Sequence, residues 1–150
     1  MIRSDSIALV TIMCNTIAQG MQFYVGQLGF VVKCDEEVDG ERLVVAAPTN
    51  LTEFAPQSAL RFREARTQRD RAAVGNQAGD GIFLQVETDD WDRVYEKLKA
   101  MGARILDPEP RTRENRYKAV TVLDNMGNRV NLINKTTTAL GRVFAKDVGI

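Results

Sequence analysis

The sequence predicts an α+β fold of two tandem βαβββ modules, and three observations lead to that prediction. Segments with strand and helix patterns follow one another in the same order in both halves of the chain. Each half contains an amphipathic helix that ends at a glycine, Gly29 or Gly102, as expected for the left-handed position that closes a helix. The strand segments before the helices, LVTIMC and GIFLQV, superpose at an offset of 72 residues. We expect a curved mixed sheet with helices outside and a concave cleft.

The first module is expected over about residues 4–66. Residues 6–14 are predicted to form a strand. Residues 15–30 are predicted to form a helix that Asn15 or Thr16 caps. The apolar positions at helical spacing, which we expect to be buried, are Ala18, Met21, Val25 and Leu28. Three further strands are expected at 29–34, 42–47 and 59–65.

Residues 67–79 are largely polar and are punctuated by Gly75 and Gly79, which is typical of a linker. The second module, at about 80–134, repeats the order, and Thr88 or Asp89 is expected to cap its helix. The apolar positions of that helix are Val94, Tyr95, Leu98 and Met101. Its strands are expected at 82–87, 104–106, 117–123 and 129–134, with a tight turn at 124–128. Both modules form one domain, 1–134, followed by a tail at 135–150.

Composition limits the function classes. With 150 residues and 44% hydrophobic side chains, the chain is long enough for one globular domain. Lys plus Arg and Asp plus Glu number 20 each, so nucleic acid and anionic membranes are not expected partners. No apolar run approaches the roughly 20 residues of a membrane span, and we expect a soluble, cytoplasmic protein. Cys14 and Cys34 lack a CxxC spacing and are expected to be buried, reduced thiols.

The chain contains no histidine. This excludes Ser/His/Asp and Cys/His catalysis, and also the usual zinc and iron sites that have histidine ligands.

Three segments carry a family resemblance: FYVGQLGF at 23–30, VETDDWDRVYEKLKAMGARI at 86–105 and LDNMGNRVNLI at 123–133. Together they resemble the vicinal oxygen chelate superfamily, which groups glyoxalase I, bleomycin-resistance proteins, fosfomycin-resistance enzymes and extradiol dioxygenases. The resemblance implies paired βαβββ modules that form a cleft, usually in a homodimer. In the metal-dependent members it implies four inward ligands, His or Gln and Glu, from the first and last strands of each module.

Carried over to this sequence, the four ligand positions are Leu9, Ala59, Gly81 and Asn131. Only the Asn131 carbonyl is a metal ligand, and a weak one. The resemblance therefore implies a member of the superfamily that uses no metal and no cofactor, and it weakens the case for the usual metal-dependent activities.

Strand alternation places further side chains on the same surface as those four positions. We predict a ligand site formed by Thr11, Met13, Arg61, Phe83, Gln85, Tyr117 and Asn131, with Ile133 on the same surface. Met13 and Phe83 would supply apolar contact, and Arg61 would hold a carboxylate or phosphate. The competing interpretation is that Met13 and Phe83 are ordinary core residues and that Arg61 is a solvated edge residue. No catalytic residue is identified.

Two arginine-rich runs, at 61–71 and 111–116, are interspersed with acidic residues and are expected to form solvated faces. If both runs border the cleft, they would favour an anionic ligand.

The preferred hypothesis is a metal-independent protein that binds a small molecule, resembling the drug-sequestering bleomycin-resistance branch. The alternative is a glyoxalase-like lyase or isomerase with a non-standard site, in which Glu64, Glu87 or Tyr117 performs acid–base chemistry; whether the protein is an enzyme stays open. A third hypothesis is a structural or regulatory dimer without a pocket.

Overall fold

The computed structural model describes residues 2–4, 7–48, 58–113 and 117–135. The chain divides into two compact units, Met1–Val74 and Gly75–Ile150. Both units contain strands and helices, which confirms the predicted α+β class. Within the described residues the strands form one sheet in each unit, where we expected a joint sheet. No helix in these residues is long and apolar enough to cross a membrane.

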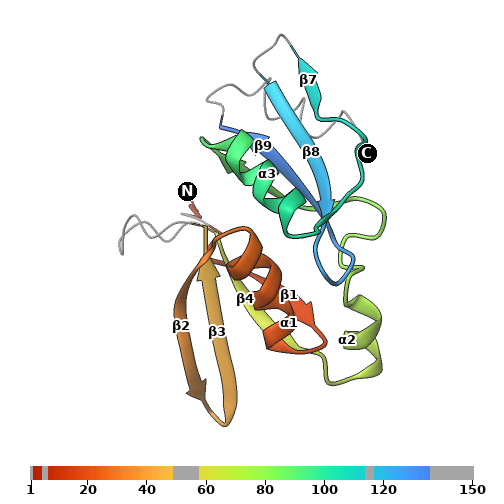
Figure 1. Cartoon of the computed structure of the whole chain (residues 1–150). Coiled ribbons are helices and arrows are strands. Elements are labelled where there is room, and N and C mark those ends of the chain that lie inside the picture. Colours follow the sequence, from red (N-terminus) through yellow and green to blue (C-terminus); the bar gives the residue numbers. More distant parts are fainter. Residues whose placement is uncertain (1, 5–6, 49–57, 114–116, 136–150) are drawn as a thin grey trace. The chain divides into compact units, whose positions relative to one another are not determined.

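The first unit contains a βαβββ module with a four-stranded sheet (Figure 1). Its elements are β1 (Leu9–Cys14), α1 (Ile17–Met21), the π-helical segment η1 (Gln22–Gln27), β2 (Val31–Val38), β3 (Glu41–Ala47), β4 (Ala59–Glu64) and α2 (Gln68–Ala73). The strand order is β1-β4-β3-β2. Strands β1 and β4 are parallel, and the other neighbours are antiparallel.

The first helix begins where the sequence predicts and changes its hydrogen bonding midway. The Oγ1 atom of Thr16 caps it by accepting a hydrogen bond from the amide of Gln19 at 3.1 Å. In the π-helical half, the amide of Leu28 donates to the carbonyl of Phe23 at 2.9 Å. Gly29, at φ +80°, then ends the helix as predicted.

The buried face of this helix differs from the prediction. The buried residues are Ile17, Gly20, Phe23 and Tyr24. Those we expected are exposed (Ala18) or half-buried (Met21, Val25 and Leu28). A Cβ atom on Gly20 would lie 2.6 Å from the Sγ of Cys14 and 2.7 Å from a ring carbon of Phe62. Because Gly20 has no side chain, the helix can pack directly on β1 and β4, and this contact decides which face is buried.

The segment predicted as a linker contains α2, which the sequence did not predict. A capping box begins this helix: the Oγ1 of Thr67 accepts from the amide of Asp70 at 3.0 Å, and the carboxylate of Asp70 accepts from the amide of Thr67 at 3.4 Å. The amide of Arg66 also donates to this carboxylate, at 3.1 Å. That bond is the largest cause of the lowered pKa of Asp70; the bond from Thr67 adds to it, and desolvation opposes both.

We expect α2 to lose stability in acid. Because the folded-state pKa of Asp70 lies below its ordinary value of 3.8, its contribution is present above that pH. It is lost as the pH falls through the folded-state pKa. Hydrogen-exchange protection factors of the α2 amides, compared with those of β4 between about pH 6 and about pH 3, would measure this. Asp70→Asn should weaken α2 and remove its pH dependence, whereas unchanged protection of the native helix in acid would contradict the prediction.

The second unit contains the other module, with a five-stranded sheet (Figure 1). Its elements are β5 (Ile82–Thr88), α3 (Trp91–Ala100), β6 (Arg104–Ile105), β7 (Arg111–Arg113), β8 (Tyr117–Leu123) and β9 (Arg129–Asn134). The strand order is β5-β9-β8-β6, and β7 also pairs with β8. Strands β8 and β9 have the predicted bounds. Strand β7 lies in a segment where the sequence analysis predicted none.

Strands β6 and β7 pair with different ends of β8, so together they occupy one strand position. The segment between them contains Pro108 and Pro110. Proline has no amide hydrogen for a sheet ladder, which explains the interruption.

Helix α3 begins one residue later than expected. Its N-cap is Asp90, which makes no side-chain capping bond, rather than Thr88 or Asp89. Trp91 is 5% exposed, and its Nε1 donates to the carbonyl of Leu132 at 3.0 Å. Leu98 is fully buried, but Met101 is 47% exposed and does not pack as predicted. Trp91 thus attaches the start of the helix to β9.

The β8–β9 turn is organised by one carboxylate. The Oδ1 of Asp124 accepts hydrogen bonds from the amides of Met126, Gly127 and Asn128, each at 2.9 Å. Its Oδ2 accepts from the side-chain amide of Asn128 at 3.0 Å. Gly127, at φ +115°, supplies the positive φ that we predicted for this turn. Asp124 is 4% exposed, so this buried group defines the turn.

Candidate functional site

The first sheet presents three predicted site residues on one face. Gly20 of α1 packs over Cys14 and Phe62, so the residues that alternate with these two face away from the helix. On that far face Thr11 pairs with Arg61, and Met13 pairs with Arg63. The structure therefore brings Thr11, Met13 and Arg61 together.

The second sheet presents a row of three polar side chains. Gln85 of β5 pairs with Asn131 of β9, which pairs in turn with Thr121 of β8. The buried apolar residues that alternate with Thr121 and Asn131, together with those of α3, form the other side of the sheet: Val120, Val122, Val130, Leu132, Trp91 and Leu98. The polar row thus lies on the face opposite α3.

The remaining two predicted residues are placed less simply. Phe83 lies at an irregularity in the pairing between Ile82 and Leu84, where strand alternation does not fix its face. Tyr117 pairs with Arg113 at the other end of β8 from the β8–β9 turn, and it is 4% exposed.

The register contradicts one step of the sequence analysis. Leu9 pairs with Ala59 in the first sheet, but the partner of Asn131 in the second sheet is Gln85, four residues beyond Gly81. An offset of 72 residues relates Leu9 to Gly81 and also Ala59 to Asn131. Because the pairings differ, these cannot both be pairs of equivalent positions. If Leu9 and Gly81 are equivalent, the first-unit counterpart of Asn131 is Arg63 rather than Ala59. Strand β4 contains no motif that could have fixed its register from sequence.

Asn131 belongs to a buried polar cluster that also contains Asp107, Arg111 and Thr121. We call these four residues the Arg111 cluster. One nitrogen of Arg111, Nη2, donates to the Oδ1 of Asn131 and to the Oγ1 of Thr121, both at 3.1 Å. The Oγ1 of Thr121 donates to the same Oδ1 at 2.7 Å. This oxygen of Asn131 therefore accepts two hydrogen bonds.

A carboxylate completes the cluster. The Oδ2 of Asp107 accepts from the amide of Thr121 at 2.6 Å, and its Oδ1 lies 3.3 Å from the Nε of Arg111. The side chains of Arg111 and Asp107 are only 10% and 15% exposed. Burial lowers the pKa of Arg111, and the charge of Asp107 opposes this shift. Since arginine remains protonated in proteins, the cluster holds a buried ion pair.

Arg111 is not among the predicted site residues, because the run at 111–116 was expected to form a solvated face. The structure shows that this expectation is wrong for Arg111. A usable signal was present: Thr121 and Asn131 are polar residues within strands that otherwise read as core, and buried polar groups require partners.

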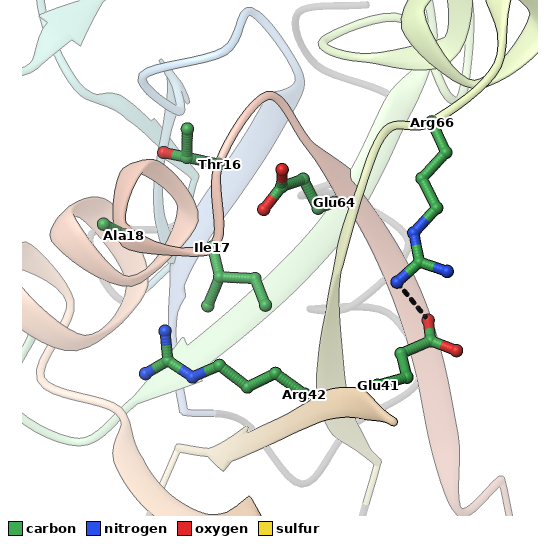
Figure 2. A pocket seen from close by; sticks show the side chains of 7 residues that line it. All are labelled: Thr16, Ile17, Ala18, Glu41, Arg42, Glu64 and Arg66. Atoms are coloured by element: carbon green, nitrogen blue, oxygen red, sulfur yellow. Dashed lines mark ion pairs between the residues drawn. The ribbon is translucent and has the colours of Figure 1, made fainter. Parts of the chain in front are cut away.

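The first unit also contains a cavity of about 290 Å³ beside α1. It is lined by Thr16, Ile17, Ala18, Glu41, Arg42, Glu64 and Arg66. Figure 2 shows the charged side chains around it, with Arg66 pointing towards Glu41 at 3.4 Å. Arg42 is paired with Asp35 at 2.9 Å. Glu64, a candidate acid–base residue of the alternative hypothesis, lines this cavity. Of the predicted ligand-site residues, Arg61 is linked to it through a 3.7 Å ion pair with Glu41.

Known proteins share this architecture. UcmS2 has a crystal structure that matches with a TM-score of 0.70 at 20% identity, over 88% of this chain and 98% of that one. TnmS3, an antibiotic binding protein from a Streptomyces species, matches with a TM-score of 0.67 at 18% identity, over 91% and 100%. At these low sequence identities, the structural matches show a shared fold.

Sequence comparison extends the likeness. An uncharacterized protein of Shewanella frigidimarina is 28% identical over 132 residues, which are 86% of this chain and 93% of that protein. A sequence profile of the Glyoxalase/Bleomycin resistance protein/Dioxygenase superfamily matches residues 6–132. The match spans both βαβββ modules, and the chain therefore belongs to this superfamily.

Proposed function

We propose that this protein binds a small organic molecule without a metal ion, and that the Arg111 cluster supplies the polar anchor. The observation that carries the proposal is the environment of Asn131. Its side-chain oxygen is the one weak metal ligand at the four superfamily positions, and it is engaged by Arg111 and Thr121.

The residues at these positions do not fit a metal ion. A cation bound to the Oδ1 of Asn131 would lie close to the positive charge of Arg111, which would repel it. The chain has no histidine, and the described residues include no group of three or more Cys, Asp or Glu side chains placed to hold a metal. If Arg63 rather than Ala59 is the first-unit equivalent of Asn131, a second positively charged side chain occupies one of the four ligand positions.

Membership of a superfamily named in part for bleomycin resistance supports ligand binding, as does the likeness to TnmS3, an antibiotic binding protein. Beside the cluster, Ala119 and Ile133 are paired across β8 and β9 on the same face as Asn131. Apolar neighbours of a polar anchor favour a largely apolar ligand. The homodimer and the cytoplasmic location stay predictions from the sequence.

The test combines metal analysis with a thermal-shift panel of apolar, aromatic and anionic compounds. We expect no stoichiometric metal in protein purified without added metal, and the same Tm increase with and without a chelator. A ligand at about 100 times its Kd adds about 2.7 kcal/mol to the free energy of unfolding. Stoichiometric zinc, nickel, manganese or iron would contradict the proposal, as would a panel in which no compound raises Tm.

Arg66→Met serves as the positional control, because it removes a guanidinium from the cavity of the first unit. It should leave the Tm increase unchanged. If instead it abolishes the increase, the ligand binds in that cavity rather than at the Arg111 cluster.

A further inference from the structure

Arg111 has hydrogen-bond donors that its neighbours do not use. Its Nη2 is fixed by Asn131 and Thr121. Its Nε and Nη1 are buried and have no hydrogen-bond acceptor within the part of the chain that the structure describes. The Nη1 group carries two N–H donors, and leaving charged donors buried without an acceptor is costly.

Asp107 neutralises the charge of Arg111 but accepts no hydrogen bond from its Nε or Nη1. Its Oδ1 lies 3.3 Å from Nε, close enough for an ion pair, but no hydrogen bond forms between them. Its Oδ2 is engaged by the amide of Thr121. The cluster therefore has balanced charge and lacks an oxygen acceptor at Nη1.

The surroundings oppose a second negative charge. Arg111 pairs with Ala119 across β7 and β8, and Ala119 pairs with Ile133. Both apolar side chains are buried, so little polar surface is available to solvate an added anion. A ligand carboxylate would also lie near the carboxylate of Asp107, and like charges repel strongly in such a site.

We infer that Arg111 binds an uncharged carbonyl group, of the amide, ester or ketone type, on a largely apolar ligand, with the carbonyl oxygen accepting from Nη1. This inference rests on the proposed function and names the class of ligand. It differs from the anionic ligand that the arginine runs would favour, because Asp107 already neutralises Arg111.

The test uses three compounds of one shape: naphthamide, naphthoate and methylnaphthalene. Their Kd values are measured by calorimetry with the full chain. We expect naphthamide to bind about tenfold more tightly than either of the others. Methylnaphthalene offers no acceptor to Nη1, and naphthoate adds a second negative charge. Arg111→Met should remove the preference for naphthamide over methylnaphthalene.

Two further variants keep the test independent of any folding defect in Arg111→Met. Asp107→Asn retains an oxygen for the amide of Thr121 and removes the negative charge, so it should shift the preference towards naphthoate. Arg93→Met, at a side chain that is 86% exposed, is the matched control and should change none of the three Kd values.

Each other result has a defined meaning. Tighter binding of naphthoate by the native protein would overturn the carbonyl assignment. Equal binding of naphthamide and methylnaphthalene would mean that solvent or another part of the chain satisfies Nη1, which also overturns it. If none of the three binds while the thermal-shift panel contains a ligand, the inference fails alone; if the panel contains none, the proposed function fails with it.

Discussion

Asp124→Ala is expected to lower the free energy of unfolding by roughly 3 kcal/mol. The carboxylate of Asp124 accepts four hydrogen bonds, from the three amides that follow in the turn and from the side chain of Asn128. Alanine would leave all four donors without this acceptor. Because Asp124 is 4% exposed, water cannot fully replace it.

The effect should extend beyond the turn. The Oδ1 of Asn128 accepts from the amide of Gln77 at 3.2 Å. A Cβ atom on Gly75, which has φ +71°, would collide with the carbonyl oxygen of Met126. The start of the second unit therefore packs on this turn, and loosening the turn should loosen residues 75–77 as well.

Chemical denaturation of the variants would measure these effects. Asp124→Asn should cost less than Asp124→Ala, because it keeps an acceptor for the three amides and loses only the bond from Asn128. Asp92→Ala is the control, since Asp92 is an exposed carboxylate paired with Lys118, and it should change the free energy of unfolding by less than about 1 kcal/mol. A loss in Asp124→Ala as small as in this control would show that the network does not stabilise the turn.

The elements that the sequence predicted well are those whose local pattern agrees with their tertiary setting. Strands β8 and β9 are rich in β-branched residues, and the turn between them has an aspartate and a glycine at the required positions. Gly29 and Gly102 likewise end their helices at positive φ. In these segments the local and the long-range preferences point to one structure.

The elements that it missed depend on contacts distant in the chain. Strand β7 has the sequence RTR, without an apolar alternation, and it exists because it pairs with β8. The buried face of α1 is decided by Gly20, whose importance appears only when Cys14 and Phe62 are placed beneath it. Spacing alone favoured the face with Ala18, Met21, Val25 and Leu28.

The candidate site likewise contains residues that the sequence predicted and residues that it did not. Asn131 was predicted from the family resemblance and Gln85 from strand alternation, and the register pairs the two residues across β5 and β9. Arg111 and Asp107 were not predicted as site residues, because a charge run is usually solvated and nothing local marks these two residues as buried. Only the pairing of β7 with β8 brings Arg111 over Thr121 and Asn131.

Asn131→Leu is expected to lower the free energy of unfolding by roughly 3 kcal/mol, although leucine has a similar volume. The substitution removes the oxygen that accepts from Arg111 and from Thr121. Arg111 would then retain its buried charge with fewer acceptors, which is the costly way to break a polar cluster.

A double-mutant cycle separates this mechanism from a simple packing defect. Arg111→Met combined with Asn131→Leu removes both partners of this hydrogen bond. Asp107 loses its ion pair with Arg111 in the single Arg111→Met variant and in the double variant alike, so that loss cancels from the coupling energy. The double variant should therefore be more stable than the sum of the two single losses predicts, with a coupling energy of about 1 kcal/mol or more. Additive losses in the cycle would mean that Asn131 stabilises the sheet through its shape, and that the Arg111 cluster does not act as a unit.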